Sequence, residues 1–228
     1  MSTVVLSGSL GSTSAMWDAQ LPALEGHRVV AIDHPGHGSA PVGEASGVSE
    51  LARRVLDAVG EGSFSFVGLS LGGAVGIQLA LDVPDRIERL VLACTSARFG
   101  EPQQWLDRAS LVRREGLAAI VDAVLARWFT PSFGDVDGFR EMFLSVDPEG
   151  YARCCEALAA MDARETLTSI VAPTLVVAGA SDPTSPPGEM ADMARAIADA
   201  RFEVLDGAAH LANVEGAQAF NQLLKEHL

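Results

Sequence analysis

One stretch in the first third of the chain constrains the fold more than any other. An apolar run at residues 64–67 leads into the turn Gly68-Leu69-Ser70-Leu71-Gly72, and residues 73–81 continue with a helix pattern. A turn this sharp needs glycine where a side chain would collide with the neighbouring strand or helix. It also holds Ser70 in a strained backbone conformation. The stretch therefore predicts a strand, a tight turn and a helix in direct succession.

Strand-like and helix-like patterns alternate on both sides of this unit. Short strands separated by helices form right-handed crossovers, so the alternation predicts an α/β domain with a mainly parallel sheet and helices on both faces. The expected strands are residues 3–6, 28–32, 64–67, 90–94, 174–178 and 201–205. The expected helices are residues 17–24, 48–59, 73–81, 189–197 and 214–224.

The alternation stops in the middle of the chain. Between residues 98 and 166 the pattern is helical, with a strong apolar face over residues 117–128 and a second clear helix at 149–161. The sequence thus predicts an α/β core from residues 1–97 and 167–228, interrupted by a helical cap of residues 98–166. A turn-rich stretch at 33–47 contains His34-Pro35-Gly36-His37-Gly38.

Charge and cysteine content limit the class of partner. The 30 acidic residues outnumber the 16 lysines and arginines, and the net charge of −14 argues against nucleic acid and anionic membranes as partners. Three cysteines provide no disulfide framework, no signal peptide is visible, and no apolar run reaches about 18 residues. We therefore expect a reduced, cytoplasmic protein without a membrane span, whose oligomeric state the sequence does not specify.

A candidate catalytic triad follows from Ser70. A serine hydroxyl needs a base within hydrogen-bond reach, and the base needs an orienting acid, in the chain order serine, acid, histidine. His210 lies in a short loop after the last expected strand, whereas His227 is penultimate and expected to fray. Asp182 follows the preceding strand and is preferred as the acid, with Asp206 as its rival.

Two backbone N–H groups are candidates for an oxyanion hole. One belongs to Leu71, the residue after the serine, and the other to Leu10 in the glycine-rich loop after the first strand. His34 and His37 lack the spacing and the carboxylate neighbours of a metal site, so we predict no metal.

The cap contributes two candidate substrate contacts. Trp128 ends the apolar helix face and serves either core packing alone or also the wall of a pocket. Arg127 beside it either pairs with a substrate carboxylate or is a surface charge.

Several segments match a known family nearly from end to end. The chain resembles the 3-oxoadipate enol-lactonases of the α/β-hydrolase superfamily, and the cap segments are the most specific part of the resemblance. The matching segments are residues 6–12 with 16–21, Gly36-His37-Gly38-Ser39, residues 68–73, 113–116, 127–130, 149–152, 155–157, 179–183 and 207–210.

The resemblance implies an α/β-hydrolase fold and a serine hydrolase that opens 3-oxoadipate enol-lactone in aromatic-compound catabolism, in the β-ketoadipate pathway. It implies a small carboxylated lactone as substrate and no cofactor. Two departures stand out: we expect no β-hairpin ahead of the first strand, where these hydrolases usually have one, and Gly8 stands where these lactonases tend to have Asn. We therefore expect about six strands, with residues 28–32 at an exposed edge.

Two alternatives remain open at this point. The chain could be another carboxylesterase or lactonase with the same triad, or a non-catalytic small-molecule receptor on the same scaffold. A haloalkane dehalogenase is disfavoured, because it would need Asp at position 70.

Overall fold

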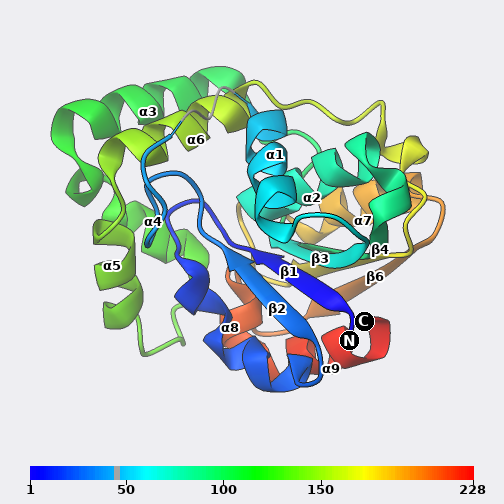
Figure 1. Ribbon diagram of the computed structural model, residues 1–228. Helices are drawn as coiled ribbons and strands as arrows, with labels where there is room; N and C mark the ends of the chain where they lie inside the picture. Colours follow the sequence, from blue (N-terminus) through cyan, green and yellow to red (C-terminus); the bar gives the residue numbers. More distant parts are fainter. Residues whose placement is uncertain (44–46) are drawn as a thin grey trace.

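A six-stranded parallel sheet forms the centre of the computed structural model, which describes residues 1–43 and 47–228 (Figure 1). The strand order is β2-β1-β3-β4-β5-β6, and every neighbouring pair is parallel. The strands are β1 (Thr3–Ser7), β2 (Arg28–Ile32), β3 (Phe64–Leu69), β4 (Ile87–Ala93), β5 (Thr174–Gly179) and β6 (Ala200–Leu205). The predicted α/β class is confirmed, and β2 lies at an edge as expected.

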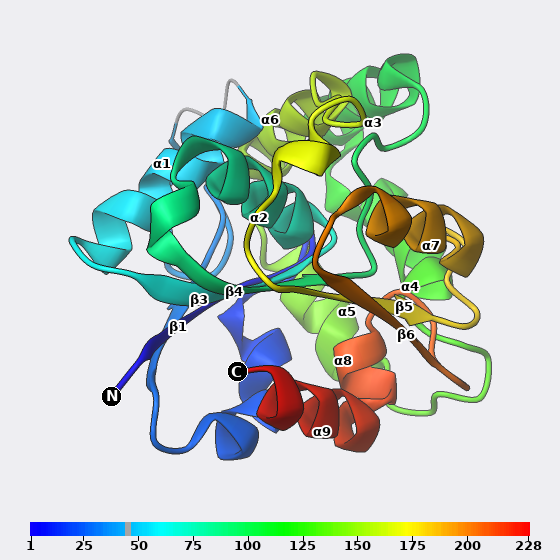
Figure 2. The same cartoon turned by 90° about the vertical axis from the view of Figure 1, so that its right-hand side faces the viewer.

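Helices cover both faces of this sheet (Figure 2). One face carries α1 (Val48–Val59), α2 (Leu71–Asp82) and α7 (Pro187–Ala196). The other carries the 3-10 helix η1 (Ser14–Leu24) together with α8 (Ala212–Glu215) and α9 (Ala217–His227). Short 3-10 helices, η2 (Pro84–Arg86) and η4 (Leu167–Ser169), precede β4 and β5.

The burial of the strands follows their place in the sheet. Every residue of β3 and β5 is buried, whereas β2 and β6 at the edges are mostly half-buried or exposed. Strands covered on both faces need continuous apolar runs, which explains why β3 was readable as a short apolar run. The helix α1 presents a single apolar face to the sheet, formed by buried Val48, Leu51, Val55 and Val59.

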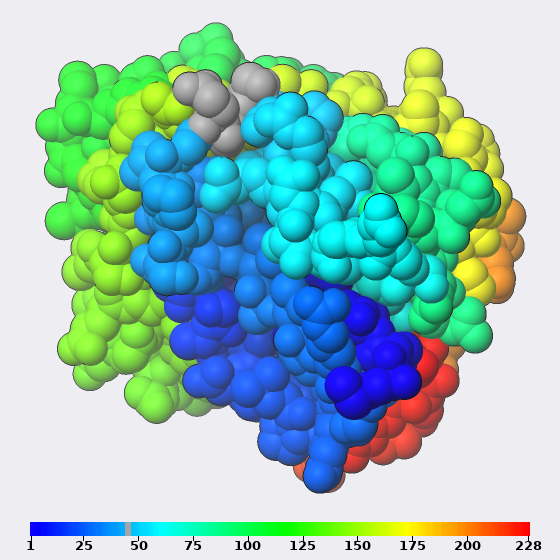
Figure 3. Space-filling model, in the orientation of Figure 1, coloured from blue at the N-terminus to red at the C-terminus, as the bar shows by residue number. Residues whose placement is uncertain are grey.

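The segment between β4 and β5 is helical, as predicted. It holds α3 (Pro102–Glu115), η3 (Leu117–Ala119), α4 (Val121–Trp128), α5 (Asp137–Leu144) and α6 (Pro148–Ala159). These helices gather at one side of the sheet, at the left in Figure 1. The same green segment forms a block beside the blue N-terminal part of the chain in the space-filling view (Figure 3). We refer to residues 98–166 as the cap.

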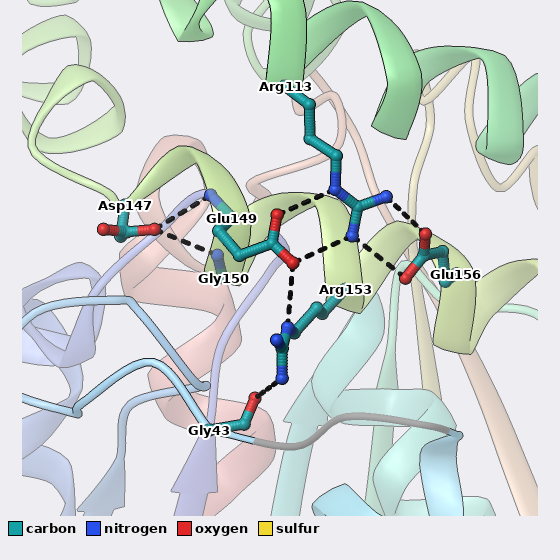
Figure 4. Close-up of polar contacts among 7 residues, drawn as sticks. All are labelled: Gly43, Arg113, Asp147, Glu149, Gly150, Arg153 and Glu156. Carbon is teal, nitrogen blue, oxygen red and sulfur yellow. Dashed lines mark hydrogen bonds and ion pairs between the residues drawn. The ribbon is translucent and has the colours of Figure 1, made fainter.

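A polar network joins the two long helices of the cap (Figure 4). Arg113 of α3 places its guanidinium between two carboxylates of α6, with Nε 2.7 Å from Glu149 Oε2 and Nη1 2.5 Å from Glu156 Oε1. Arg153 of α6 donates both to Glu149 and to the carbonyl oxygen of Gly43, at 2.9 and 3.1 Å. The network therefore ties α3 to α6 and ties α6 to the loop that follows β2.

Three expected helices differ from the structure in continuity or in helix type. The face predicted over residues 117–128 is split into η3 and α4, because Ile120 between them leaves the helical region with φ −125° and ψ −7°. The expected C-terminal helix is divided into α8 and α9 at Gly216. The first helix is a 3-10 helix that contains Pro22, a residue without the N–H that an α-helix needs.

Two further expectations concern loops and membranes. The predicted turn-rich stretch 33–47 includes residues 44–46, which lie outside the described residues. In the described part of the chain, every helix is too short or too polar to cross a bilayer. Cys94, Cys154 and Cys155 are buried free thiols.

Candidate active site

Ser70 sits at the turn between β3 and α2, in a strained backbone conformation. Its φ is 58° and its ψ is −114°. Among the described residues, Ser70 and Cys94 are the only non-glycine residues with a positive φ. Hydrogen bonds hold the turn: the Ser70 N–H donates to Ala93 O at 2.9 Å, and Thr95 Oγ1 donates to Ser70 O at 2.7 Å. The strain is therefore maintained by the neighbouring strand end.

The glycines around Ser70 allow three backbone segments to meet. A Cβ on Gly68 would lie 2.2 Å from Gly72 O, at the start of α2. A Cβ on Gly72 would lie 2.0 Å from Ser7 O, at the end of β1. These distances are far below van der Waals contact, so both positions require glycine, as the sequence pattern indicated.

Asp182 and His210 come together from two loops at the carboxyl ends of β5 and β6. The His210 Nδ1 lies 2.8 Å from Asp182 Oδ2, and both side chains are buried. The other oxygen of the carboxylate accepts the N–H groups of Thr184 and Ser185, at 2.8 and 3.2 Å. The turn after β5 thus fixes the carboxylate, and the carboxylate can orient the imidazole ring.

The loop that carries His210 is held from two sides. Gly179 lets β5 approach it closely, since a Cβ there would lie 2.1 Å from Ala209 O. The Glu215 carboxylate accepts the Ala209 N–H at 2.7 Å and the Thr130 N–H at 2.9 Å, which links the loop to the end of α4 in the cap. Leu211 N–H also donates to Trp128 O at 2.9 Å.

The rivals for the acid and the base lie elsewhere. Asp206 is exposed, and the carboxylate bonded to His210 is that of Asp182. The expectation that His227 frays is wrong: α9 extends through it, and its Nε2 lies 3.1 Å from Leu90 O. A helix end packed against a strand is ordered by that contact, which a position in the sequence does not reveal.

The two candidate oxyanion donors flank the elbow. Leu71 is the first residue of α2, and Leu10 lies in the loop after β1. This loop is joined to the elbow by a bond from the Gly72 N–H to Gly8 O, at 3.0 Å. Among the described residues, neither the Leu10 N–H nor the Leu71 N–H donates a hydrogen bond. Both groups are therefore available to a ligand.

A pocket of about 290 Å³ lies between the core and the cap. Ser70, His210 and Leu10 line it from the core, so the structure brings these three predicted residues to one cavity. The other lining residues are Ser9, Pro183 and Thr184 from core loops, and Phe99, Gly100, Gln104, Trp105, Arg108, Val124, Arg127, Trp128 and Tyr151 from the cap segment. Asp182 lies behind His210 rather than on the pocket wall.

The charged cap residues of this pocket are both arginines. Arg127 is exposed at the pocket and Arg108 is half-buried. Neither forms a salt bridge with any described residue. The pKa of Arg127 is lowered by partial burial and by the positive charge of Arg108, so the two cations are close enough to repel each other. An anionic ligand would relieve this repulsion.

Arg108 is a pocket residue that the sequence reasoning missed. Together with Gln104 and Trp105 it lies on one face of α3, and its guanidinium stacks over the Trp105 ring at 4.8 Å. Arg108 is four positions after Gln104 and three after Trp105, and both spacings place side chains next to each other on a helix, so this spacing was the available signal. Without the fold, nothing in the sequence distinguishes that face from a solvated one.

Trp128 combines both roles considered for it. Its side chain is only 3% exposed and packs edge-on against Phe143, with ring centroids 5.8 Å apart. It also lines the pocket beside Tyr151.

His34 and His37 are buried under the loop that carries Leu10, and the described residues contain no group of three or more His, Cys, Asp or Glu suited to a metal ion.

Comparison with known proteins identifies the family. The model of the alpha/beta hydrolase family matches residues 4–223. The chain belongs to this family. The 3-oxoadipate enol-lactonase 2 of Acinetobacter baylyi is 37% identical over 97% of this chain and 86% of its own length. Together with the solved structures below, this confirms the resemblance to the enol-lactonases.

Solved structures of family members match almost the whole chain. The enol-lactonase from Burkholderia xenovorans LB400 superposes with a TM-score of 0.93 and 38% identity, covering 99% of this chain and 90% of its own. A thermophilic esterase from Thermogutta terrifontis, with malate bound, has a TM-score of 0.92 and 30% identity, with coverages of 99% and 89%. This member of the alpha/beta hydrolase family is an enzyme, a carboxylic ester hydrolase, which sets aside the receptor alternative.

Proposed function

We propose that this hydrolase opens 3-oxoadipate enol-lactone to 3-oxoadipate, as a step in aromatic-compound catabolism. The observation that carries the proposal is a single pocket that combines Ser70 and His210 with two arginines that have no acidic partner among the described residues. In a chain with a net charge of −14, two arginines that form no salt bridge with a described residue, on the wall of the candidate site, favour an anionic substrate. The enol-lactone carries one carboxylate beside the ester group.

The proposed reaction begins with attack on the lactone carbonyl. Ser70 Oγ forms a bond to the carbonyl carbon while His210 Nε2 accepts its proton. Asp182 holds the Nδ1–H of His210 and stabilises the imidazolium that forms. The N–H groups of Leu10 and Leu71 bind the oxyanion of the tetrahedral intermediate. These hydrogen bonds strengthen as negative charge develops on the oxygen, so they stabilise the transition state more than the bound substrate.

Ring opening and hydrolysis complete the cycle. Collapse of the tetrahedral intermediate breaks the ring C–O bond, and the imidazolium returns its proton to the departing enol oxygen. The enol tautomerises to the ketone while the opened substrate remains bound to Ser70 as an acyl ester. A water molecule activated by His210 then releases 3-oxoadipate and restores the serine. No cofactor takes part in these steps.

Arg127 and Arg108 are proposed to hold the substrate carboxylate. Arg127 at the pocket and Arg108 on α3 offer planar donors suited to a carboxylate. Trp128 closes the pocket as an apolar wall next to them. The cap thereby selects the substrate, while the core carries out the bond changes.

The decisive experiment is turnover of 3-oxoadipate enol-lactone by the purified chain. We expect Ser70→Ala to lower kcat by at least about 10³-fold, since loss of the nucleophile removes most of the triad's contribution. Ser49→Ala, an exposed serine of α1, is the matched control and should retain wild-type kcat. Equal rates for wild type and Ser70→Ala would reject the triad.

A second candidate is a carboxylesterase with another acyl preference, favoured by the similarity to the Thermogutta terrifontis esterase. A panel of neutral and carboxylated esters, measured beside the enol-lactone, separates the two. The proposed function requires that kcat/KM for the enol-lactone exceed that for every neutral ester of similar size. A preference for neutral esters would favour the carboxylesterase.

A further inference from the structure

Two buried histidines outside the pocket contact the loop that carries Leu10. His34 and His37 belong to the loop after β2 and are 3% and 0% exposed. His34 Nε2 lies 3.0 Å from Gly8 O, and the Gly11 N–H donates to His37 Nε2 at 3.0 Å. The two contacts therefore fall on either side of Leu10, two residues before it and one residue after it.

The hydrogen-bond directions define the protonation state of each ring. Gly11 N–H can only donate, so His37 Nε2 is an unprotonated acceptor and the proton of the neutral ring sits on Nδ1. That Nδ1 donates to Pro35 O at 3.0 Å. Gly8 O can only accept, so His34 Nε2 carries a proton.

Burial keeps His37 in the neutral state that this arrangement needs. Loss of solvation, together with the neighbouring His34, lowers the pKa of His37 to about 3. Burial also lowers the pKa of His34. A protonated His37 would carry hydrogen on both ring nitrogens and could not accept from Gly11. The arrangement is therefore maintained across the neutral pH range.

The cap closes over the same group. The Tyr151 ring of α6 lies parallel to the His37 ring, with centroids 6.5 Å apart and planes inclined by 21°. Gly11 has a φ of 91°, and a Cβ there would lie 2.5 Å from the Phe143 ring. His37 is thus enclosed between the Leu10 loop and the aromatic side chains of the cap.

We propose that His34 and His37 are positioning residues that hold the Leu10 N–H at the oxyanion site. The inference rests on the proposed function, because it assumes that this N–H stabilises the oxyanion. The Leu10 N–H donates to no described residue, so its direction is set by Gly8 and Gly11, whose backbone groups are bonded to the two histidines. Gly8 O also accepts the Gly72 N–H at 3.0 Å, which relates the position of Leu10 to that of Leu71 beside Ser70.

The role of His37 predicts a specific kinetic effect. An oxyanion donor acts in the transition state, so a misdirected Leu10 N–H should lower kcat and leave KM nearly unchanged. His37→Leu removes the acceptor for the Gly11 N–H at similar bulk. His37→Gln retains an acceptor oxygen near the place of Nε2. His27→Gln is the matched control, because the His27 ring lies near the surface and, among the described residues, its one side-chain hydrogen bond is to Ser2 Oγ.

The experiment measures hydrolysis of p-nitrophenyl acetate per active site titrated with a serine-directed phosphonate. We expect His37→Leu to lower kcat by about 10- to 100-fold, below the effect of losing a whole oxyanion donor, with KM within about twofold. The affinity for a boronate, a mimic of the tetrahedral intermediate, should fall by the same factor as kcat/KM. His37→Gln should recover kcat to within about threefold of wild type.

A purely structural role gives a different result. It would lower the melting temperature and the titrated fraction but leave kcat per titrated site within twofold of wild type, which would overturn the proposal. Equal losses of kcat in His37→Leu and His37→Gln would also overturn it.

The aryl ester separates this inference from the proposed function. Turnover of p-nitrophenyl acetate without turnover of the enol-lactone would reject the substrate but still test His37. If the wild type hydrolyses neither, hydrogen exchange of the peptide covering residues 8–12 gives the answer. Exchange of the Gly11 amide should be faster in His37→Leu than in wild type and His37→Gln, and unchanged exchange would reject the positioning role.

Discussion

Single residues around the elbow have little freedom to vary. Gly72 has backbone atoms of β1 where its Cβ would be. Ser70 keeps a φ of 58° because Ala93 at the end of β4 and Thr95 just after it bond to its N–H and its carbonyl oxygen. The pattern around Ser70 was readable in the sequence because such close approaches admit only glycine. Arg108 was not readable, because its role depends on which face of α3 meets the pocket.

Replacing Gly72 should damage both folding and activity. In Gly72→Ala the added methyl group would lie 2.0 Å from Ser7 O, and backbone on both sides must shift. We expect the free energy of unfolding to fall by about 3 kcal/mol, measured by urea denaturation. Gly138→Ala in α5 is the matched control: its Cβ meets nothing within 4 Å, and we expect a gain of about 0.5–1 kcal/mol. Similar stabilities for the two variants would contradict this account.

The two pocket arginines should affect substrate binding rather than the bond-breaking step. We expect Arg127→Gln and Arg108→Gln each to raise KM for the carboxylated lactone about tenfold, because one charge-assisted hydrogen bond to a carboxylate is lost. Hydrolysis of a neutral aryl ester should be unaffected, which serves as the internal control. Steady-state kinetics on both substrates test this. A loss of kcat on both would show instead that the arginines support the structure of the site.

At the scale of elements, the cap depends on the contact between α3 and α6. Figure 4 shows Arg113 shared by Glu149 and Glu156. The Arg113 guanidinium, followed by that of Arg153, lowers the pKa of Glu149 to about 2. Both glutamates in these pairs, Glu149 and Glu156, are partly exposed, so solvent weakens each pair and only the shared geometry adds to stability.

Removing the shared arginine should loosen the cap by a modest amount. We expect Arg113→Ala to reduce the free energy of unfolding by about 1 kcal/mol, equivalent to about 2–4 °C in melting temperature. The loss should shrink in about 1 M salt, where ion pairs are screened. Arg114→Ala is the control, because Arg114 is exposed and its one ion pair among the described residues is with its neighbour Glu115, at 3.6 Å. A salt-independent loss would point to packing of the side chain rather than to charge.

At the scale of the whole molecule, buried neutral histidines make stability depend on pH. The folded chain holds the pKa of His34 and His37 below the ordinary value of 6.5, chiefly through burial. Between the folded and unfolded pKa values, the unfolded chain binds more protons. The stabilising contribution is therefore complete above about pH 6.5 and is lost progressively as the pH falls toward about 3 for His37.

This linkage predicts acid destabilisation above the range in which carboxylates titrate. Between pH 6.5 and 5 we expect the free energy of unfolding to fall by up to about 1.4 kcal/mol per pH unit for each such histidine. Half-buried His227, whose pKa is also lowered, adds to the total. Urea denaturation at several pH values measures the slope, and His37→Gln should make it shallower. An identical slope in His37→Gln would contradict the assignment of a neutral buried ring.

Local pattern was sufficient for most elements and for the order of the candidate triad. Fully buried strands such as β3 and β5 read as apolar runs, because burial on both faces leaves no polar positions, and α1 reads as one apolar face, because burial on one side leaves a helical period. Ser70, Asp182 and His210 were found because each follows an expected strand, and the carboxyl ends of parallel strands meet at one edge. Helix ends were less readable, since the breaks at Ile120 and Gly216 arise from local backbone geometry within continuous apolar patterns.

Contacts between distant segments could be obtained only from the tertiary structure. Three such contacts join residues far apart in the chain. His210 bonds to Asp182 rather than to Asp206, His227 is ordered by its contact with β4, and Arg108 lies close to Arg127. The same holds for His34 and His37, which the sequence marked only as unsuited to a metal. Their hydrogen bonds to Gly8 and Gly11 exist because parallel pairing brings the loops after β1 and β2 together. Periodicity records which face of an element is buried, but only the folded chain specifies what that face touches.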